Sequence, residues 1–134
     1  MNGFRNVVLA AVIGLGACAS QPGVTITVPG EGDTVAGSLL VRLGAAGVKV
    51  VPATGTAVAG EGHHHVFVDV DPPAATGPIL TGPGIIHLGK GVDSLRLDSL
   101  AAGPHRLIAV FASGNHVPMA GVRQDTVRFV VRVP

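Results

Sequence analysis

The residues of this chain most able to do chemistry are its histidines. All six lie between positions 63 and 116, and three of them are consecutive. Among side chains, imidazole is the commonest ligand of metal ions. In a β-strand, His63 and His65 point to one face and His64 to the other. The spacing therefore predicts a metal site to which His63 and His65 contribute together.

A second group of candidate ligands follows farther along the chain. Met119 comes three residues after His116, and an imidazole beside a thioether suits copper better than zinc. We therefore take His63, His65 and His116 as the first candidate ligands for copper or zinc. The next candidates are His87, His105 and Met119, and the other site residues are His64, Asp69 and Lys90.

A structural role is the alternative for each of these residues. A histidine at the end of a strand can bond a backbone carbonyl in a turn, and Met119 can fill a gap in a core. A metal-dependent enzyme is the least favoured interpretation, because it also needs a general base, for which Asp69 and Glu61 are the candidates. The sequence lacks the Gly-x-Ser-x-Gly pattern of a hydrolase nucleophile. Lys90, between two glycines, is expected to lie in solvent at a tight hairpin turn.

The elements that must position these side chains are β-strands. Apolar and polar residues alternate over 24–28, 39–43, 48–50, 95–97 and 127–133, and turns rich in Gly and Pro separate these stretches. About seven short strands at this spacing indicate an all-β fold. We expect an immunoglobulin-like antiparallel β-sandwich, with a small β-barrel as the alternative.

Two stretches depart from this alternation. Apart from their histidines, Asp69 and Arg106, every position is apolar over residues 63–70 and 105–111. Continuous apolar runs are typical of strands that are covered on both faces. We expect both to lie in the middle of their sheets, with a loop, a partner or a membrane over the outer side.

The N-terminus predicts a lipoprotein signal peptide over residues 1–17. Arg5 lies in a short basic start, an apolar run follows, and the small residues before Cys18 match a cleavage site that ends in cysteine. Cys18 would then carry the membrane lipid. Residues 18–23 would include a short tether, and residues 24–134 would form a single β-sandwich domain.

This signal predicts where the protein is found. The domain would be attached to a membrane of the cell envelope and face the periplasm or the exterior. Ala19, the residue after the lipidated cysteine, favours the outer membrane in a host that has one.

Composition excludes several classes of partner. Nine basic and eight acidic residues give a formal net charge of +1, which is far from the basic surface that nucleic acids require. Aromatic residues make up 3% of the chain, and neither Trp nor Tyr is present. Stacking of bases or sugars on aromatic rings is therefore not expected.

Several motifs occur in an order that is similar to a known family. They are residues 47–53, GHHHVFVD at 62–69, HLGKG at 87–91, GPHRL at 103–107 and HVPM at 116–119. This order resembles the bacterial family known as domain of unknown function 4399, over about residues 33–133. Its members are small secreted or envelope-attached domains without an established activity.

The resemblance implies a set of shared histidines. By matching position these are His63, His64, His65, His87, His105 and His116. The sequence departs from the family where Met119 and Ile85 stand in place of histidines that members often carry. If the family binds metal, these changes reduce the number of nitrogen ligands here and favour a softer metal or no metal.

The sequence thus predicts a membrane-anchored envelope lipoprotein that is a non-enzymatic binding module with a His-rich site for copper or zinc. The alternative is a structural or protein-interaction module of the envelope, with structural histidines and an unidentified protein partner.

Overall fold

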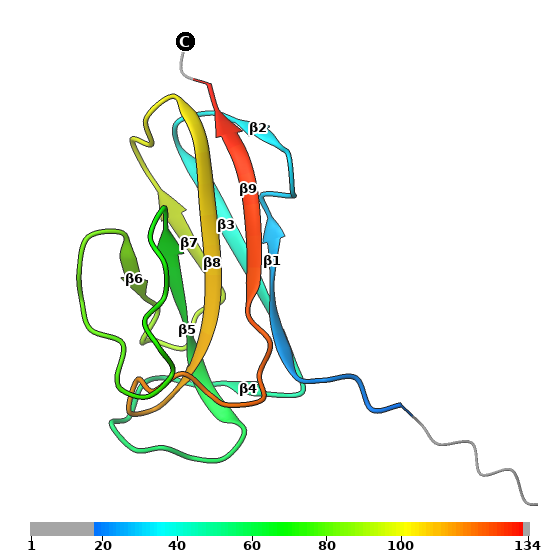
Figure 1. The fold of residues 1–134 in the computed structure, drawn as a ribbon, viewed down its shortest axis with the longest axis vertical. Coiled ribbons are helices and arrows are strands. Elements are labelled where there is room, and N and C mark those ends of the chain that lie inside the picture. The colour runs from blue at the N-terminus through cyan, green and yellow to red at the C-terminus, as the bar shows by residue number, and fades with distance from the viewer. Residues whose placement is uncertain (1–17, 133–134) are drawn as a thin grey trace, which may run out of the picture.

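The computed structural model describes residues 18–132, so the predicted signal peptide at 1–17 lies outside the described residues. Among the residues that it describes, no helix is long and apolar enough to cross a membrane. The described chain folds into nine β-strands (Figure 1). They are β1 (Gly23–Val28), β2 (Thr34–Val35), β3 (Leu39–Ala46), β4 (Lys49–Val50), β5 (Glu61–Val68), β6 (Ile85–His87), β7 (Ser94–Leu97), β8 (Gly103–Ser113) and β9 (Asp125–Val131).

The strands form two sheets that pack against each other, which confirms the predicted all-β sandwich. One sheet has the order β1-β3-β7. The other has the order β2-β9-β8-β5-β4, and β6 also pairs with β5. In Figure 1, β3 crosses behind β8 and β9, so the larger sheet lies in front of the smaller one.

The two apolar stretches that were expected to be central are neighbours in one sheet. They correspond to β5 and β8, which pair antiparallel over seven positions from Gly62 to Val68. The other edge of β5 is covered by β4 at its start and by β6 near its end. Both strands are therefore central, as predicted.

Alternation along β5 and β8 divides the apolar residues between two cores. The larger core fills the space between the sheets and includes Val41 and Leu43 from one sheet and Leu107 and Phe129 from the other. A second cluster lies on the outer face of the larger sheet, where Phe67 packs with strand residues from β8. Ile79, from the long connection between β5 and β6, covers this outer face. Of the three predicted covers, a loop, a partner or a membrane, the structure shows a loop.

Two details of the predicted topology are wrong. Two short pairs, β2 with β9 and β4 with β5, are parallel rather than antiparallel. The turn that contains Lys90 does not form a hairpin, because it connects β6 in one sheet to β7 in the other. Lys90 itself is exposed, as expected. Alternation within a strand gives no information on strand direction, which depends on how the connections cross the sandwich.

Candidate metal centre

His63 and His65 lie on the outer face of the larger sheet. His63 is opposite Ala112 and His65 is opposite Val110 in the pairing of β5 with β8. Val110 and Ala112 belong to the outer apolar cluster, so the two rings point away from the core between the sheets. Both side chains are buried. The predicted shared face of His63 and His65 is therefore confirmed.

Strand pairing brings His87 to the same face. β6 is only three residues long, and its antiparallel register places His87 directly opposite His65. Residues in direct register across two strands point to the same side of the sheet. Gly89 leaves room for the His87 ring, because a Cβ built at Gly89 would lie only 2.5 Å from His87 Nε2.

A tight turn after β8 supplies His116. Its backbone N–H donates to the carbonyl of Ser113 at 2.8 Å, and His116 adopts a left-handed backbone conformation with φ 68°. The His116 carbonyl accepts a hydrogen bond of 2.9 Å from the N–H of Ile79. This bond ties the turn to the connection that covers the outer face, so both segments are fixed relative to β5.

The four rings of His63, His65, His87 and His116 surround one point, and we refer to them as the four-histidine cluster. All six centroid distances among these rings lie between 4.7 and 5.9 Å. Around a tetrahedral ion with metal–nitrogen bonds of about 2.0–2.1 Å, ring centroids are about 5 Å apart. The arrangement of the rings thus has the dimensions of a metal site.

The nitrogen atoms converge as well as the rings. Nε2 of His63 and His65 are 3.0 Å apart, and Nε2 of His87 and His116 are 3.2 Å apart. His63, His87 and His116 each offer a nitrogen within 4.8 Å of the other two. This group of three does not include His65, whose close nitrogen contact is with His63. Nitrogens on a tetrahedral ion are about 3.4 Å apart and cis nitrogens on a square-planar ion about 3.0 Å apart. Small adjustments of the rings would therefore admit an ion.

Burial favours the neutral form that metal ligation requires. Burial, followed by the charges of His87 and His116, lowers the pKa of His63 to about 4. Burial and the neighbouring histidines lower the pKa of His65 to about 3. At neutral pH both rings are neutral and have a lone pair to donate.

Packing, rather than hydrogen bonds to the second ring nitrogen, orients the rings of His63 and His65. Nδ1 of His63 and Nδ1 of His65 are buried without a hydrogen-bond partner among the described residues. Many metal-bound histidines are oriented by an acceptor on the second ring nitrogen. Here the packing between β5, β6 and the turn at His116 holds the rings instead.

His64 occupies the opposite face of β5, as predicted. It lies opposite Phe111 in the sheet, and the two rings meet edge to face at 5.5 Å between centroids. The His64 ring is completely buried, and neither ring nitrogen has a partner among the described residues. Burial lowers the His64 pKa, so the ring is neutral.

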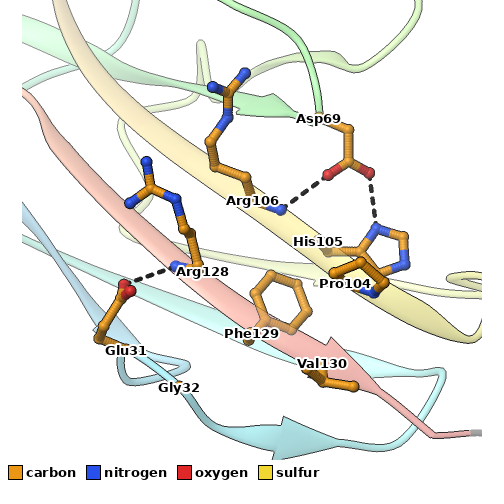
Figure 2. Close-up of a pocket in the computed structure, with 9 residues that line it drawn as sticks. All are labelled: Glu31, Gly32, Asp69, Pro104, His105, Arg106, Arg128, Phe129 and Val130. Atoms are coloured by element: carbon orange, nitrogen blue, oxygen red, sulfur yellow. Dashed lines mark hydrogen bonds and ion pairs between the residues drawn. The ribbon is translucent and has the colours of Figure 1, made fainter.

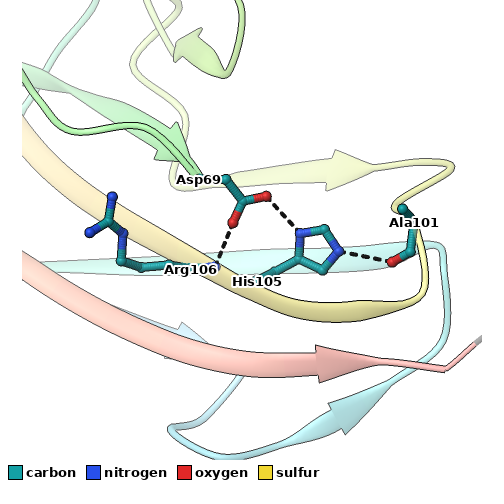
Figure 3. A network of polar contacts seen from close by, with 4 residues as sticks. All are labelled: Asp69, Ala101, His105 and Arg106. Carbon is teal, nitrogen blue, oxygen red and sulfur yellow. Dashed lines mark hydrogen bonds and ion pairs between the residues drawn. The ribbon is translucent and has the colours of Figure 1, made fainter.

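His105 lies far from the four-histidine cluster. It is seven residues before Ala112 along β8, which is about 23 Å at roughly 3.3 Å per residue. Its Nδ1 donates to Asp69 Oδ2 at 2.7 Å and its Nε2 donates to the carbonyl of Ala101 at 2.8 Å (Figure 3). Because both partners are acceptors, the ring carries a proton on each nitrogen.

The surroundings of His105 give it a structural role rather than a place in the cluster. Partial burial acts to lower its pKa, but the hydrogen bonds to Ala101 and Asp69 and the charge of Asp69 raise the pKa above 6.5. Asp69 Oδ1 also accepts from the backbone N–H of Arg106 at 2.8 Å. His105 and Asp69 line a separate surface hollow beside Arg128 and Phe129 (Figure 2).

The structure does not bring Met119 or Lys90 to the cluster either. Met119 packs against the core between the sheets, which is the opposite side of β8 from the cluster. Its backbone N–H donates to the carbonyl of Phe111. Lys90 is solvated in the turn after β6. Met119 thus fills the core, as its structural alternative predicted, and no longer favours a soft metal.

Sequence reasoning ranked His87 below His116, yet both belong to the group of close potential ligands. The signal that could have raised His87 was Gly89, two residues later, whose lack of a side chain accommodates the ring. Sequence reasoning also missed the connection that contains Ile79, which is bonded to His116 and forms one wall beside the cluster.

Comparison with known proteins gives a fold and a family. A search among curated proteins found no match. The chain is similar to the crystal structure of an engineered protein, with 19% sequence identity and a TM-score of 0.50. That likeness covers 84% of this chain and 20% of the other, and at this identity it supports the fold alone. Residues 41–132 match the family described as Domain of unknown function (DUF4399), and this range contains the whole four-histidine cluster.

Proposed function

We propose, for a chain that belongs to the DUF4399 family, that the protein is a non-enzymatic module that binds one copper or zinc ion. The ligands are His63, His65, His87 and His116. The observation that carries the proposal is the convergence of these four imidazoles from three separate segments, with ring centroids no more than 5.9 Å apart. Chance rarely collects four side chains of one type around a point.

The nature of the ligands selects the metals. Imidazole nitrogen suits zinc, copper and nickel, whereas carboxylate oxygen suits calcium and magnesium. Among the described residues, the group of close potential ligands contains histidines and no carboxylate. The stability order of divalent complexes predicts that Cu²⁺ binds more tightly than Zn²⁺.

The enzyme alternative is less well supported by the placement of acids. A metal-dependent hydrolase needs a general base beside the metal-bound water. Of the two predicted candidates, Asp69 bonds His105 and Glu61 pairs with Lys49 at 3.0 Å. Neither carboxylate is in the group of potential ligands.

A purely structural role is the second candidate, and one observation favours it. Nε2 of His63 faces Nε2 of His65, and Nε2 of His87 faces Nε2 of His116, at hydrogen-bond distances. The His87–His116 hydrogen bond would tie β6 to the turn at His116 without an ion, and the His63–His65 hydrogen bond would fix two rings of β5 against each other. The experiment below separates the two roles.

Attachment to the envelope through a lipid on Cys18 remains part of the proposal. Cys18 is exposed, and it comes five residues before the start of β1. A lipid there would keep the domain close to a membrane surface. Mass spectrometry of the protein from its own cells would detect the acyl groups on Cys18.

The test of metal binding is titration of the untagged protein with Cu²⁺ and Zn²⁺. Calorimetry should give one equivalent. At a free metal concentration a hundred times the Kd, binding should stabilise the fold by about 2.7 kcal/mol and raise its Tm. His87→Ala, at an exposed ring, should remove most of this effect, and His105→Gln should preserve it.

The structural role predicts a different result. His87→Ala would then lower the Tm in metal-free buffer, and no metal at about 100 μM would raise the Tm of the wild type. That outcome would end the metal-binding proposal. It would turn attention to protein partners of the envelope.

A further inference from the structure

A pocket opens beside the four-histidine cluster. Its volume is about 370 Å³, and His65, His87 and His116 form one end of it. The remaining wall comes from Pro78, Ile79, Leu80, Thr81 and Ile85. We call this space the aliphatic pocket. His63 does not line the aliphatic pocket, so the other three rings form the side of the cluster that faces it.

The walls of the aliphatic pocket are held in place by the fold. Ile79 is buried, and its N–H donates to the carbonyl of His116. Ile85 lies on β6, two residues before His87. The pocket is therefore built from β6, which carries His87, and from the connection that is bonded to the turn at His116, and a bound molecule would touch both the ion and these walls.

The charge of the ion beside an uncharged wall indicates the charge of the molecule that the pocket would bind. Among the described residues, no Asp, Glu, Lys or Arg lines the aliphatic pocket, and the imidazoles of the cluster carry no negative charge. A divalent ion held there would keep a charge of about +2 beside an apolar wall. An uncompensated charge in apolar surroundings is unfavourable, so an anion that reaches the ion is stabilised.

We propose that the metal-loaded cluster binds a small monocarboxylate, with one carboxylate oxygen on the ion and an aliphatic body in the aliphatic pocket. This inference rests on the proposed metal site. Carboxylate oxygen is an accepted ligand of zinc and copper, and here it would be the fifth ligand of an ion that four imidazoles hold. The volume lies at the lower end of the roughly 300–1,000 Å³ of ligand pockets, which suits a short chain.

Polyanions fit the aliphatic pocket less well. Phosphate and sulfate have several oxygens that need hydrogen-bond donors or cations. Among the pocket residues outside the cluster, Thr81 carries the one side-chain hydroxyl, and the others are aliphatic or proline. A monocarboxylate leaves a single polar end to satisfy, and the metal satisfies it.

The test uses the untagged full chain loaded with one equivalent of Cu²⁺, and its probes are hexanoate, acetate and neutral hexanamide. The copper electron paramagnetic resonance spectrum is followed at each addition. Hexanoate should change it saturably and hexanamide should not. Each methylene that enters the pocket should tighten binding by up to about fourfold, so hexanoate should bind more tightly than acetate.

A matched pair of variants locates the aliphatic body. Leu80 lines the pocket and Leu40 lies on β3 in the other sheet, and both are exposed, by 74% and 37%. Leu80→Ala should reduce the preference for hexanoate over acetate at least threefold, because part of the apolar wall is lost. Leu40→Ala should leave the preference unchanged.

Failure of this inference is distinct from failure of the metal site. If Cu²⁺ binds but hexanoate leaves the spectrum unchanged, or hexanoate and acetate bind equally, the carboxylate site is refuted and the metal site stands. A preference that survives Leu80→Ala also refutes it. If Cu²⁺ does not bind in the cluster, both proposals fail together.

Discussion

Histidine serves three purposes in this chain, and the surroundings of each ring decide which. His63 and His65 face other histidines on the outer side of β5. His64 is enclosed by the core between the sheets, and His105 bridges two acceptors near the other end of β8. Residue type and spacing predicted five of these histidines as candidate metal ligands and His64 as another site residue, with a structural role as the alternative for each. They could not separate the three purposes, because these purposes depend on partners distant in sequence.

His64 is expected to lower the stability of the fold. A buried polar group without a partner costs about 1–3 kcal/mol, and both ring nitrogens of His64 lack a partner among the described residues. His64→Leu should therefore raise the free energy of unfolding by about 1 kcal/mol, as measured by chemical denaturation.

A polar replacement provides the control for His64. His64→Asn keeps an unpaired polar group in the core and should bring no gain. If His64→Leu destabilises the protein as much as His64→Asn does, the ring is satisfied by an interaction that the described contacts do not contain.

His105 should make stability depend on pH. Its folded-state pKa is raised, so its contribution is fully present below the ordinary pKa of about 6.5 and is lost as pH rises through the folded-state value. His105→Gln should therefore cost more free energy of unfolding at about pH 6 than at about pH 9, by about 1 kcal/mol.

The hydrogen bond to the Ala101 carbonyl and then the Asp69 carboxylate, which accepts from His105 Nδ1, raise the pKa of His105 and cause this dependence. In an Asp69→Asn background, the effect of His105→Gln should differ less between the two pH values, because the hydrogen bond to Ala101 alone remains to raise the pKa of His105. A constant cost of His105→Gln in the wild-type background would show instead that the ring is neutral in the folded protein.

At the scale of elements, short strands and turns are what assemble the four-histidine cluster. The two-residue period of side chains along a strand correctly predicts the faces of His63, His64 and His65, because that information is local. β6 is three residues long and has no alternating pattern, so its pairing with β5 was not predictable. The turn at His116 depends on a left-handed residue and on a bond to a distant loop.

Gly89 should act as a positioning residue for His87. A Cβ at this position would collide with the His87 ring, which can swing away but would then leave the cluster. Gly89→Ala should weaken metal binding by about tenfold or more, as loss of a residue that orients a ligand commonly does. Calorimetric titration measures the change in affinity.

A glycine in open surroundings supplies the control. An added Cβ at Gly77, which lies in the connection between β5 and β6, meets nothing within 4 Å. Gly77→Ala should leave the affinity for metal unchanged. Equal effects of Gly89→Ala and Gly77→Ala would mean that the two changes act through the backbone and not through His87.

At the scale of the whole molecule, the sandwich creates two separate chemical environments. The inner core holds the sheets together, while the outer face of β5 and β8 carries the cluster under a loop. The alternating pattern predicted the sandwich, and the two continuous apolar stretches predicted its central strands. Which histidines converge was not predictable, because strand order, two parallel pairs and the path of the covering loop decide it.

The central claim is that one ion is held by four imidazoles, and X-ray absorption of the copper-loaded, untagged protein tests it most directly. The structure predicts three or four nitrogen neighbours at about 2.0 Å, with the multiple-scattering pattern of imidazole rings. A shell dominated by oxygen, with one imidazole or none, would contradict the claim. Sulfur in the shell would likewise contradict it, because Met119 packs in the core on the other face of the sheet.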